Sequence, residues 1–354
     1  MKVFSVYRGL SEGLGRAARR LPATRAPLPR VGYLLLTRRC NIACSMCFLR
    51  AHAADPPPAP ELTGPEWIAL IRGLPRPAVL SLTGGEPLLH PAFHDIFSAA
   101  AQRGPVVLET NATRLDADEA RWLLAHSPLR PAAGLAVLSV SIHGPPEVHD
   151  RLVGRPGAFA AASAGVEHLA QLRGRRGVPR LAIRAVVQPE TLSGLPALPA
   201  LVRRMGADEL VLSVHGSAPD VMDPSRPASC GSPSLPSPIA AEDLGPVLEQ
   251  VLASSEVPVQ INPAGSLPEI VDLYRGVWDP AAHDCLFPWM RFIVSAQGEL
   301  GVCPHVWAGS LRGRSFREVW NGAPAARHRH FLREASELPP ACAGCCSRMR
   351  RRTS

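Results

Sequence analysis

Eight of the nine cysteines in this 354-residue chain fall into two groups. Cys40, Cys44 and Cys47 form the first group, and Cys230 stands apart. The second group is Cys285, Cys303, Cys342, Cys345 and Cys346. The N-terminal stretch lacks the apolar core and the small-residue cleavage site of a signal peptide, so we expect a reducing, cytoplasmic compartment. Clustered thiols in that compartment indicate metal binding or catalysis before disulfides.

The first group has the composition of an iron–sulfur site. Three thiolates in one short loop can hold three irons of a 4Fe–4S cluster and leave the fourth iron open. An open iron can chelate the amino and carboxylate groups of S-adenosylmethionine and reduce its sulfonium. A zinc knuckle is the alternative, but it requires a fourth ligand close by, and none follows before His52.

Six short apolar runs would position this loop, and segments with helical apolar spacing separate them. The runs are residues 32–37, 78–83, 105–110, 136–142, 181–187 and 209–214. Runs that are apolar on both faces predict parallel strands covered by helices. Six strands are fewer than the eight of a closed barrel, so we predict an α/β fold, a partial (β/α)6 TIM-like barrel. Its chemistry should gather at the C-terminal ends of the strands.

The rest of the chain divides by composition. The predicted segments are an N-terminal extension (1–30), the barrel (31–215), a Pro/Ser-rich loop (216–240), a helical connector (241–284) and a small cysteine-rich domain (285–354). We expect the extension to form a helix lying on the barrel, and the Pro/Ser-rich loop to be a lid or a solvated linker. The last domain should begin with a hairpin that turns near Gln297 and Gly298.

Charge and hydropathy exclude two classes of partner. No apolar run approaches the roughly 18 residues that span a bilayer, so no membrane span is expected. The net charge is +8, yet Lys2 is the only lysine and aromatic residues make up 5% of the chain. No basic block is interleaved with aromatic residues as in a single-strand binding platform, so nucleic acid is not an expected partner.

The first cysteine group closely resembles the radical S-adenosylmethionine (SAM) superfamily, because its CxxxCxxC spacing has Met46 before the last cysteine and Phe48 after it. Three further segments resemble motifs of that family over roughly residues 31–215. They are Thr83–Pro87 (the GGEP motif), Thr110–Thr113 (TNG, with alanine for glycine) and Ser139–Gly144 (SxDG, with histidine for aspartate).

The resemblance implies a set of cofactor contacts. Cys40, Cys44 and Cys47 would hold the SAM-cleaving 4Fe–4S cluster, with SAM as the second cofactor. The implied contacts to SAM are Gly84, Gly85, Glu86, Asn111 and Ser141. Glycine there would let the backbone approach the methionine moiety. Val153 occupies a place where arginine is frequent, which leaves Arg151, Arg155 and Arg184 as candidates for the partner of the cofactor's carboxylate.

The second cysteine group resembles a twitch domain, the shorter relative of the SPASM domain. Pro288–Trp289 after its first cysteine and Glu318–Asn321 further on support this resemblance. It implies one auxiliary 4Fe–4S cluster with the ligands Cys285, Cys303, Cys342 and Cys345. Cys346 could take the place of Cys345, and a structural zinc ribbon is the alternative.

The implied activity is that of a radical SAM enzyme, of oxidoreductase type. It would cleave SAM to a 5′-deoxyadenosyl radical that abstracts hydrogen from a substrate, with a reducing partner such as flavodoxin or ferredoxin. An auxiliary cluster closed by four cysteines would accept an electron, which favours dehydrogenation of a small molecule such as an aminocyclitol or sugar. Only 39 residues precede Cys40, which also favours a small substrate over a peptide.

Two alternatives stay open from the sequence. One is a peptide-modifying or cofactor-maturing radical SAM enzyme, and the other is a non-catalytic zinc-binding scaffold. His143, His215 and Cys230 could face the substrate, although such isolated residues are more often bystanders.

Overall fold

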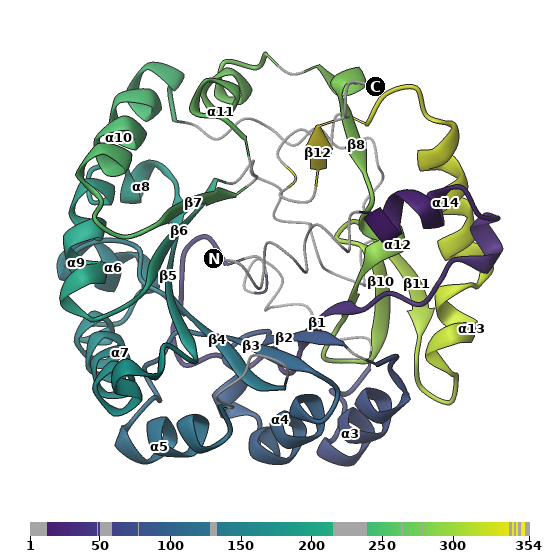
Figure 1. The fold of residues 1–354 in the computed structure, drawn as a ribbon, viewed down its shortest axis with the longest axis horizontal. Coiled ribbons are helices and arrows are strands. Elements are labelled where there is room, and N and C mark those ends of the chain that lie inside the picture. Colours follow the sequence, from purple (N-terminus) through teal and green to yellow (C-terminus); the bar gives the residue numbers. More distant parts are fainter. Residues whose placement is uncertain are drawn as a thin grey trace.

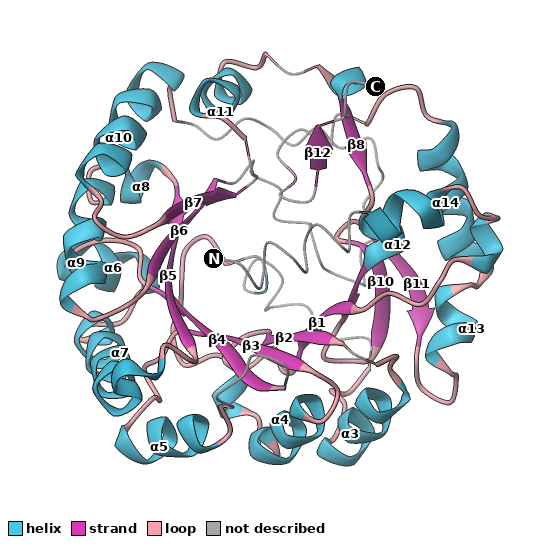
Figure 2. Cartoon of the chain, viewed as in Figure 1, coloured by secondary structure: helices cyan, strands magenta, loops and turns pink. Residues whose placement is uncertain are grey.

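The computed structural model describes residues 13–47, 49, 59–76, 78–127, 133–214, 239–262, 265–277, 279–339, 342, 345 and 348–350. A curved ten-stranded sheet lines the inside of the molecule and helices cover its outside (Figures 1 and 2). Within the described residues, no helix is both long enough and apolar enough to cross a membrane.

Seven consecutive parallel strands form the barrel part of the sheet. They are β1 (Val31–Leu35), β2 (Val79–Thr83), β3 (Pro105–Thr110), β4 (Gly134–Ser141), β5 (Arg180–Val187), β6 (Glu209–Val214) and β7 (Val259–Asn262). The outer helices are α3 (Gly64–Gly73), α4 (Phe93–Ala101), α5 (Ala117–Ala125), α6 (Pro146–Val153), α7 (Ala158–Arg173), α8 (Pro189–Leu192), α9 (Leu198–Arg204), α10 (Ala241–Ser254) and α11 (Leu267–Tyr274).

The six predicted strands are confirmed, and the sheet continues beyond them. The predicted helical connector 241–284 contains the helices α10 and α11, and it also holds a seventh parallel strand, β7, that was not predicted. Its four residues, VQIN, are half-buried or exposed and offer no apolar run by which a strand is recognised from sequence.

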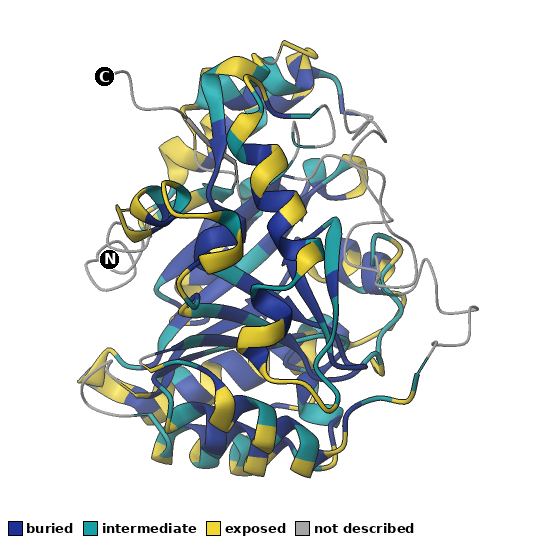
Figure 3. Cartoon of the chain, turned by 90° about the vertical axis from the view of Figure 1, so that its right-hand side faces the viewer, coloured by how far each residue is buried: buried dark blue, intermediate teal, exposed yellow. Residues whose placement is uncertain are grey.

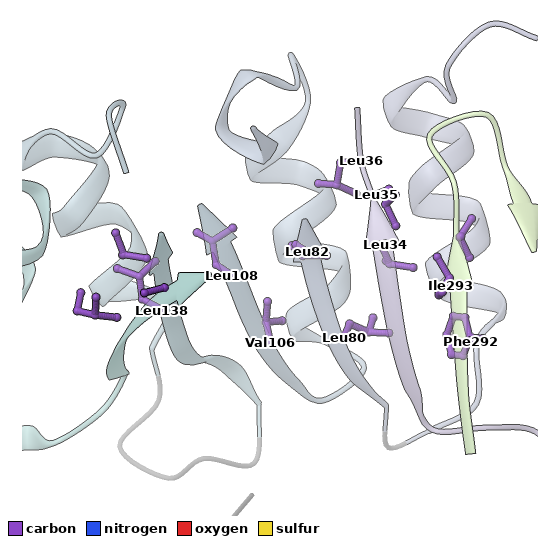
Figure 4. Packing of buried hydrophobic residues seen from close by; sticks show 14 of the residues in the cluster. Leu34, Leu35, Leu36, Leu80, Leu82, Val106, Leu108, Leu138, Phe292 and Ile293 are labelled. Carbon is purple, nitrogen blue, oxygen red and sulfur yellow. The ribbon is translucent and has the colours of Figure 1, made fainter. Parts of the chain in front are cut away.

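The main core lies between the sheet and its helices. Leu34, Leu80, Leu82, Leu108 and Leu138 point to the helix side and are fully buried (Figure 4). Figure 3 shows the same layering, with buried strands inside and exposed outer faces on the helices. A small separate cluster of Val137, Ala182 and Val211 lies on the opposite, inward face of the strands. The strands therefore bury one face against helices and turn the other toward the interior of the barrel.

The C-terminal elements join this sheet at β1. They are β8 (His283–Cys285), α12 (Phe287–Met290), β9 (Arg291–Val294), β10 (Glu299–Cys303), β11 (Val306–Ser310), α13 (Phe316–Trp320), α14 (Ala323–Glu334) and β12 (Arg348–Arg350). Strand β9 runs parallel to β1, and β10 and β11 continue the sheet in antiparallel order. The predicted hairpin, turning at Gln297 and Gly298, is confirmed. It extends the barrel sheet and does not form a separate sheet.

The N-terminal segment packs on these C-terminal elements, and the expectation that its helix lies on the barrel is wrong. The helix over 13–19 lies beside α12 and α14 (Figure 1). A side chain at Gly15 would collide with Met290 of α12. Arg19 forms an ion pair with Asp284 and donates to Leu332 O at 2.8 Å. These polar contacts fix residues 13–30 to the cysteine-rich end of the chain.

Arg329 of α14 is the centre of this attachment. Its guanidinium is fully buried and lies over the Trp320 ring, with 4.2 Å between Cζ and the ring centroid. It donates to the carbonyls of Pro288 (2.7 Å), Trp320 (2.8 Å) and Ala23 (3.2 Å). Burial lowers the pKa of Arg329 to about 9. One buried cation thus satisfies carbonyls from three separate segments.

We expect Arg329→Lys to destabilise the protein strongly. Lysine keeps the charge but not the planar fork, so buried carbonyls lose their donors at a cost of about 3 kcal/mol in the free energy of unfolding. Urea denaturation measures this change. The control is Arg327→Lys, an exposed position on the same helix, where we expect a change below about 0.5 kcal/mol. Equal stability of the two variants would contradict the role given to Arg329.

Two buried histidines tie the end of β4 to β5 and α6. The amide of Val186 donates to His143 Nδ1 at 3.2 Å, and the amide of His143 donates to His149 Nδ1 at 3.3 Å. The two rings stack, with their centroids 5.7 Å apart. Burial lowers the pKa of His143 to about 3 and that of His149 to about 4, so both are neutral acceptors. His143 is thus a structural residue of the interior.

This pair should make the protein sensitive to acid. The unfolded chain binds protons on these histidines below a pH of about 6.5, whereas the folded chain does not until pH 3 to 4. The contribution of this pair to the free energy of unfolding is therefore fully present above pH 6.5. It decreases as the pH falls, by about 2 kcal/mol per histidine at pH 5. We expect His149→Asn, which keeps an acceptor that does not titrate, to reduce the loss between pH 7 and pH 5 in urea denaturation. The control is His168→Asn, at an exposed position. Between pH 7 and pH 5 this variant should lose as much free energy of unfolding as the wild type.

Candidate functional site

The first cysteine group lies in a loop that directly follows β1 and rests on the end of α6. The amide of Ala43 donates to Val153 O at 2.7 Å, and that of Ser45 to Leu152 O at 3.1 Å. Arg155 Nη1 donates to Asn41 O at 3.2 Å. The loop atoms in all three of these bonds belong to the backbone, so the backbone of the loop is held against α6 and the residue that follows it closely.

The two glycines after β2 hold the other side of this loop. The amide of Gly85 donates to Thr37 O at 2.7 Å. A Cβ at Gly84 would lie 2.6 Å from Thr37 O, and a Cβ at Gly85 would collide with Arg39 O. Gly84 also has a φ of 126°, which side chains rarely tolerate. Both glycines therefore permit close approach to the segment that leads into Cys40, and their approach to the cofactor stays a prediction.

Glu86 is a buried carboxylate that joins the ends of β2 and β3. It accepts from Thr110 Oγ1 at 2.7 Å, from the amide of Asn111 at 2.8 Å and from the amide of Leu88 at 3.2 Å. Burial raises its pKa to about 7. Its side chain orders the turn that presents Asn111, and its backbone amide donates to Arg39 O at 2.8 Å.

Asn111 belongs to a closed ring of hydrogen bonds with Asn41 and Thr113. Its Nδ2 donates to Asn41 Oδ1 at 3.0 Å and reaches Cys40 Sγ at 3.7 Å. Thr113 Oγ1 donates to Asn111 Oδ1 at 2.6 Å and accepts from Asn41 Nδ2 at 2.8 Å. Sequence reasoning missed Asn41 and Thr113. The sequence did offer a signal for them, because Asn41 follows Cys40 directly and Thr113 lies two residues after Asn111.

Ala112 adopts the left-handed conformation, with a φ of 56°, and is buried. It stands where the related motif has glycine. Alanine therefore adopts here a backbone conformation that favours glycine.

The thiols of the first group have the chemistry of iron–sulfur ligands, because thiolate is a soft donor. Cys40 is exposed as a residue, yet partial desolvation of its sulfur raises the thiol pKa, and Glu86 and Cys47 raise it further. Among the described residues, no three His, Cys, Asp or Glu side chains are arranged around one metal position. A 4Fe–4S cluster instead distributes three thiolates over three different irons.

The inward face of the strands presents polar side chains beside this loop. Arg184 of β5 donates to Ser139 Oγ at 3.4 Å and to Ser213 Oγ at 3.1 Å. Ser141, at the end of β4, is half-buried. Of the three arginines considered for the cofactor's carboxylate, only Arg184 lies on this inward face. Arg151 is exposed in the last turn of α6, and Arg155 is exposed just after that helix.

Glu109 of β3 lies in register with Ser139 on the same inward face. It accepts from Ser81 Oγ at 2.9 Å. The interior of the barrel near its catalytic end therefore carries a carboxylate, a guanidinium and several hydroxyls, which suits a polar ligand.

The second cysteine group gathers around the start of β9. Cys285 precedes α12 and β9, and Cys303 ends β10, which runs antiparallel to β9, so both lie toward the same end of that strand. Strand β12 pairs with β8 and sets Arg348 opposite Cys285, and the amide of Cys345 donates to Cys342 O at 3.1 Å. Burial raises the pKa of Cys285 to about 11. Thiolate is a soft ligand of the kind that an iron–sulfur cluster takes, and ligation by a metal would lower the pKa of Cys285.

Some of the predicted residues lie outside the described part of the chain. They are Phe48, His52, His215, Cys230 and Cys346.

Comparison with known proteins agrees with this arrangement. Residues 34–198 match the model of the radical SAM superfamily, and residues 285–346 match that of the SPASM iron–sulfur cluster-binding domain. The AdoMet-dependent heme synthase of Methanosarcina barkeri is 28% identical over 90% of this chain and 88% of its own length. The mycofactocin maturase MftC of Mycobacterium ulcerans is 27% identical over 88% of this chain and 77% of its own length.

Solved structures share the fold. Streptococcus suis SuiB superposes with a TM-score of 0.63 at 12% identity, covering 96% of this chain and 77% of that one. The enzyme anSMEcpe with bound AdoMet superposes with a TM-score of 0.58 at 14% identity, covering 89% and 91% of the two chains. At these identities the likeness shows the fold alone. The two matched models show that the chain belongs to the radical SAM superfamily and carries a C-terminal SPASM-type iron–sulfur cluster-binding domain.

Proposed function

We propose that Cys40, Cys44 and Cys47 hold the SAM-cleaving cluster, and that SAM lies between this loop and the inward ends of β2 to β5. The observation that carries the assignment is the Asn41–Asn111–Thr113 ring, which directs the Asn111 amide to Cys40 Sγ. When bound, the cluster and SAM supply a one-electron reductive cleavage that gives methionine and a 5′-deoxyadenosyl radical.

Each residue around this position has a distinct task. Gly84 and Gly85 permit the close approach that fixes the entry to the loop, and Glu86 orders the turn that carries Asn111. Ser141 and Arg184 face the interior, where a guanidinium with hydroxyl partners can bind the carboxylate of the methionine moiety. The closed ring of bonds keeps the Asn111 amide preorganised.

The second cysteine group is proposed to hold an auxiliary cluster with Cys285, Cys303, Cys342 and Cys345 as ligands. Four thiolates would close it to direct substrate binding, so its role would be to accept an electron from the substrate radical. This supports the oxidoreductase interpretation. It does not depend on Cys346, which lies outside the described residues.

The relatives favour cofactor maturation over dehydrogenation of an aminocyclitol. The M. barkeri heme synthase aligns over 90% of this chain, and a pre-heme d1 synthase of Dinoroseobacter shibae is 31% identical over 50% of it. Named relatives support no aminocyclitol substrate. We therefore propose a tetrapyrrole-type substrate and a role in cofactor maturation.

Peptide modification is the second candidate. Mycofactocin maturase aligns over 88% of this chain, the sporulation killing factor maturation protein SkfB of Bacillus subtilis is 30% identical over 41%, and SuiB was crystallised with its precursor peptide SuiA. The 39 residues before Cys40 do not decide between the two, because the full-length alignments include relatives of both kinds.

Anaerobic reconstitution tests the two-cluster assignment. We expect about eight irons per wild-type chain and about four in the Cys40→Ala, Cys44→Ala, Cys47→Ala triple variant, because four irons are bound per cluster. Dithionite with SAM should yield 5′-deoxyadenosine from the wild type and none from the variant. Bound zinc with almost no iron would instead establish the scaffold alternative.

Substrate class is tested by the same anaerobic assay with iron coproporphyrin III, an aminocyclitol, or no addition. We expect the tetrapyrrole to raise 5′-deoxyadenosine formation about tenfold and to undergo a mass change, because a bound substrate consumes the radical that otherwise forms slowly. Mass spectrometry detects both. A response to the aminocyclitol alone would overturn the proposal, and a response to a precursor peptide encoded nearby would establish the second candidate.

A further inference from the structure

A carboxylate outside the motifs of the first cysteine group holds the segment that leads into that group. Glu61 Oε2 accepts from Thr37 Oγ1 at 2.8 Å, and Glu61 Oε1 accepts from the amide of Arg38 at 2.6 Å. Thr37 is fully buried, and its hydroxyl also accepts from the amide of Arg39 at 3.1 Å. Glu61 therefore contacts, directly or through one hydroxyl, the residues that come immediately before Cys40.

This carboxylate belongs to a short segment, residues 60–63, which we call the strap. The amide of Leu62 donates to Ala296 O, in the turn between β9 and β10, at 2.7 Å. Arg312, just after β11, donates to Pro60 O at 2.9 Å. The last residue of the strap caps α3. The strap therefore has a fixed place between the C-terminal hairpin and the exit of β1.

The glycine turn after β2 holds the same segment through different atoms. Its amides donate to the carbonyl oxygens of Thr37 and Arg39, whereas Glu61 engages a backbone amide and a hydroxyl. The loss of one set of bonds would therefore not be replaced by the other. Without Glu61, the Arg38 amide and the buried Thr37 hydroxyl would each lose an acceptor inside the protein.

We propose that Glu61 is a positioning residue for SAM cleavage, and that the strap sets the course of the chain into Cys40. This inference rests on the proposed function, because it requires a SAM-cleaving cluster in the loop that Cys40 begins. Cleavage depends on how the open iron and the sulfonium are placed relative to each other. A shift of the segment before Cys40 would move the loop relative to the strand ends that would bind SAM. Glu61 itself would touch neither SAM nor substrate.

The test variant is Glu61→Ala, assayed after reconstitution with dithionite as the reductant and with rates expressed per bound iron. We expect kcat for 5′-deoxyadenosine formation to fall about tenfold, because the loop no longer keeps its position relative to the sulfonium. The KM for SAM should stay within about twofold, since the groups proposed to bind SAM are unchanged. A purely structural role would lower the stability of the protein without changing kcat of the folded enzyme.

Glu318→Ala is the matched control. Glu318 accepts from the hydroxyl and from the amide of Ser315, both at 2.7 Å, so its removal also deprives one hydroxyl and one backbone amide of their acceptor. It belongs to α13, which packs on β10 and β11. The control also changes the net charge equally, and we expect its kcat and KM to stay within about twofold of the wild type.

Two further variants test the contact from both sides. Thr37→Val removes the hydroxyl that Glu61 accepts from, and it should lower kcat in the same direction. The double variant Glu61→Ala, Thr37→Val should stay within about twofold of Glu61→Ala, because both substitutions break one connection. Glu61→Gln keeps one acceptor oxygen and should give an intermediate kcat.

Hydrogen exchange of the full-length protein, followed by mass spectrometry, gives a readout that does not depend on cleavage. Peptides over residues 36–47 should exchange faster in Glu61→Ala than in the wild type, and at the wild-type rate in Glu318→Ala. Peptides from β4 and β5 should exchange equally in all three proteins, which shows that the variants are folded.

Several outcomes would overturn the positioning role. They are an unchanged kcat in Glu61→Ala, an equal fall of kcat in the control, a rise of KM alone, and unchanged exchange of residues 36–47. Absence of 5′-deoxyadenosine from the wild type refutes the proposed function instead. The exchange measurement then decides separately whether Glu61 holds the segment before Cys40.

Discussion

The site depends on the close approach of two backbones at the ends of β1 and β2. Gly84 and Gly85 pass so near residues 37–39 that any Cβ would collide with a carbonyl. The same close approach lets the amide of Gly85 donate to Thr37 O and the amide of Glu86 donate to Arg39 O. The position of the residue before Cys40 is thereby set by hydrogen bonds to the neighbouring strand end.

A single buried carboxylate extends this constraint to the next strand. Burial of Glu86 opposes its charge, while its three donors favour it, and burial has the larger effect because the pKa is raised to about 7. Removing the acceptor would leave Thr110 and the Asn111 amide without a partner inside the protein. The ends of β1, β2 and β3 are thus joined in sequence, from the glycine turn to the Asn41–Asn111–Thr113 ring.

Much of this arrangement could be predicted from sequence, because the strands are apolar on both faces and the cysteines have a specific spacing. Sequence reasoning did not predict the features that no run of neighbouring residues indicates. Strand β7 has no apolar run, and the N-terminal helix binds the C-terminal elements through partners about 300 residues away, such as Leu332 for Arg19. His143 stood at the end of a strand, as a substrate-facing residue would, but only the fold shows its ring bonded to Val186 and buried.

The register of β9 on β1 has a consequence for the two cysteine groups. Val31 pairs with Arg291 and Leu34 with Val294, so the chain enters both strands at the same edge of the sheet. The Cys40 loop follows the far end of β1, whereas Cys285 and Cys303 lie near the start of β9. Five residues at about 3.3 Å each separate these ends by roughly 15 Å. The two cysteine groups therefore join this strand pair at opposite ends, and the parallel register of β9 on β1 sets their order along it.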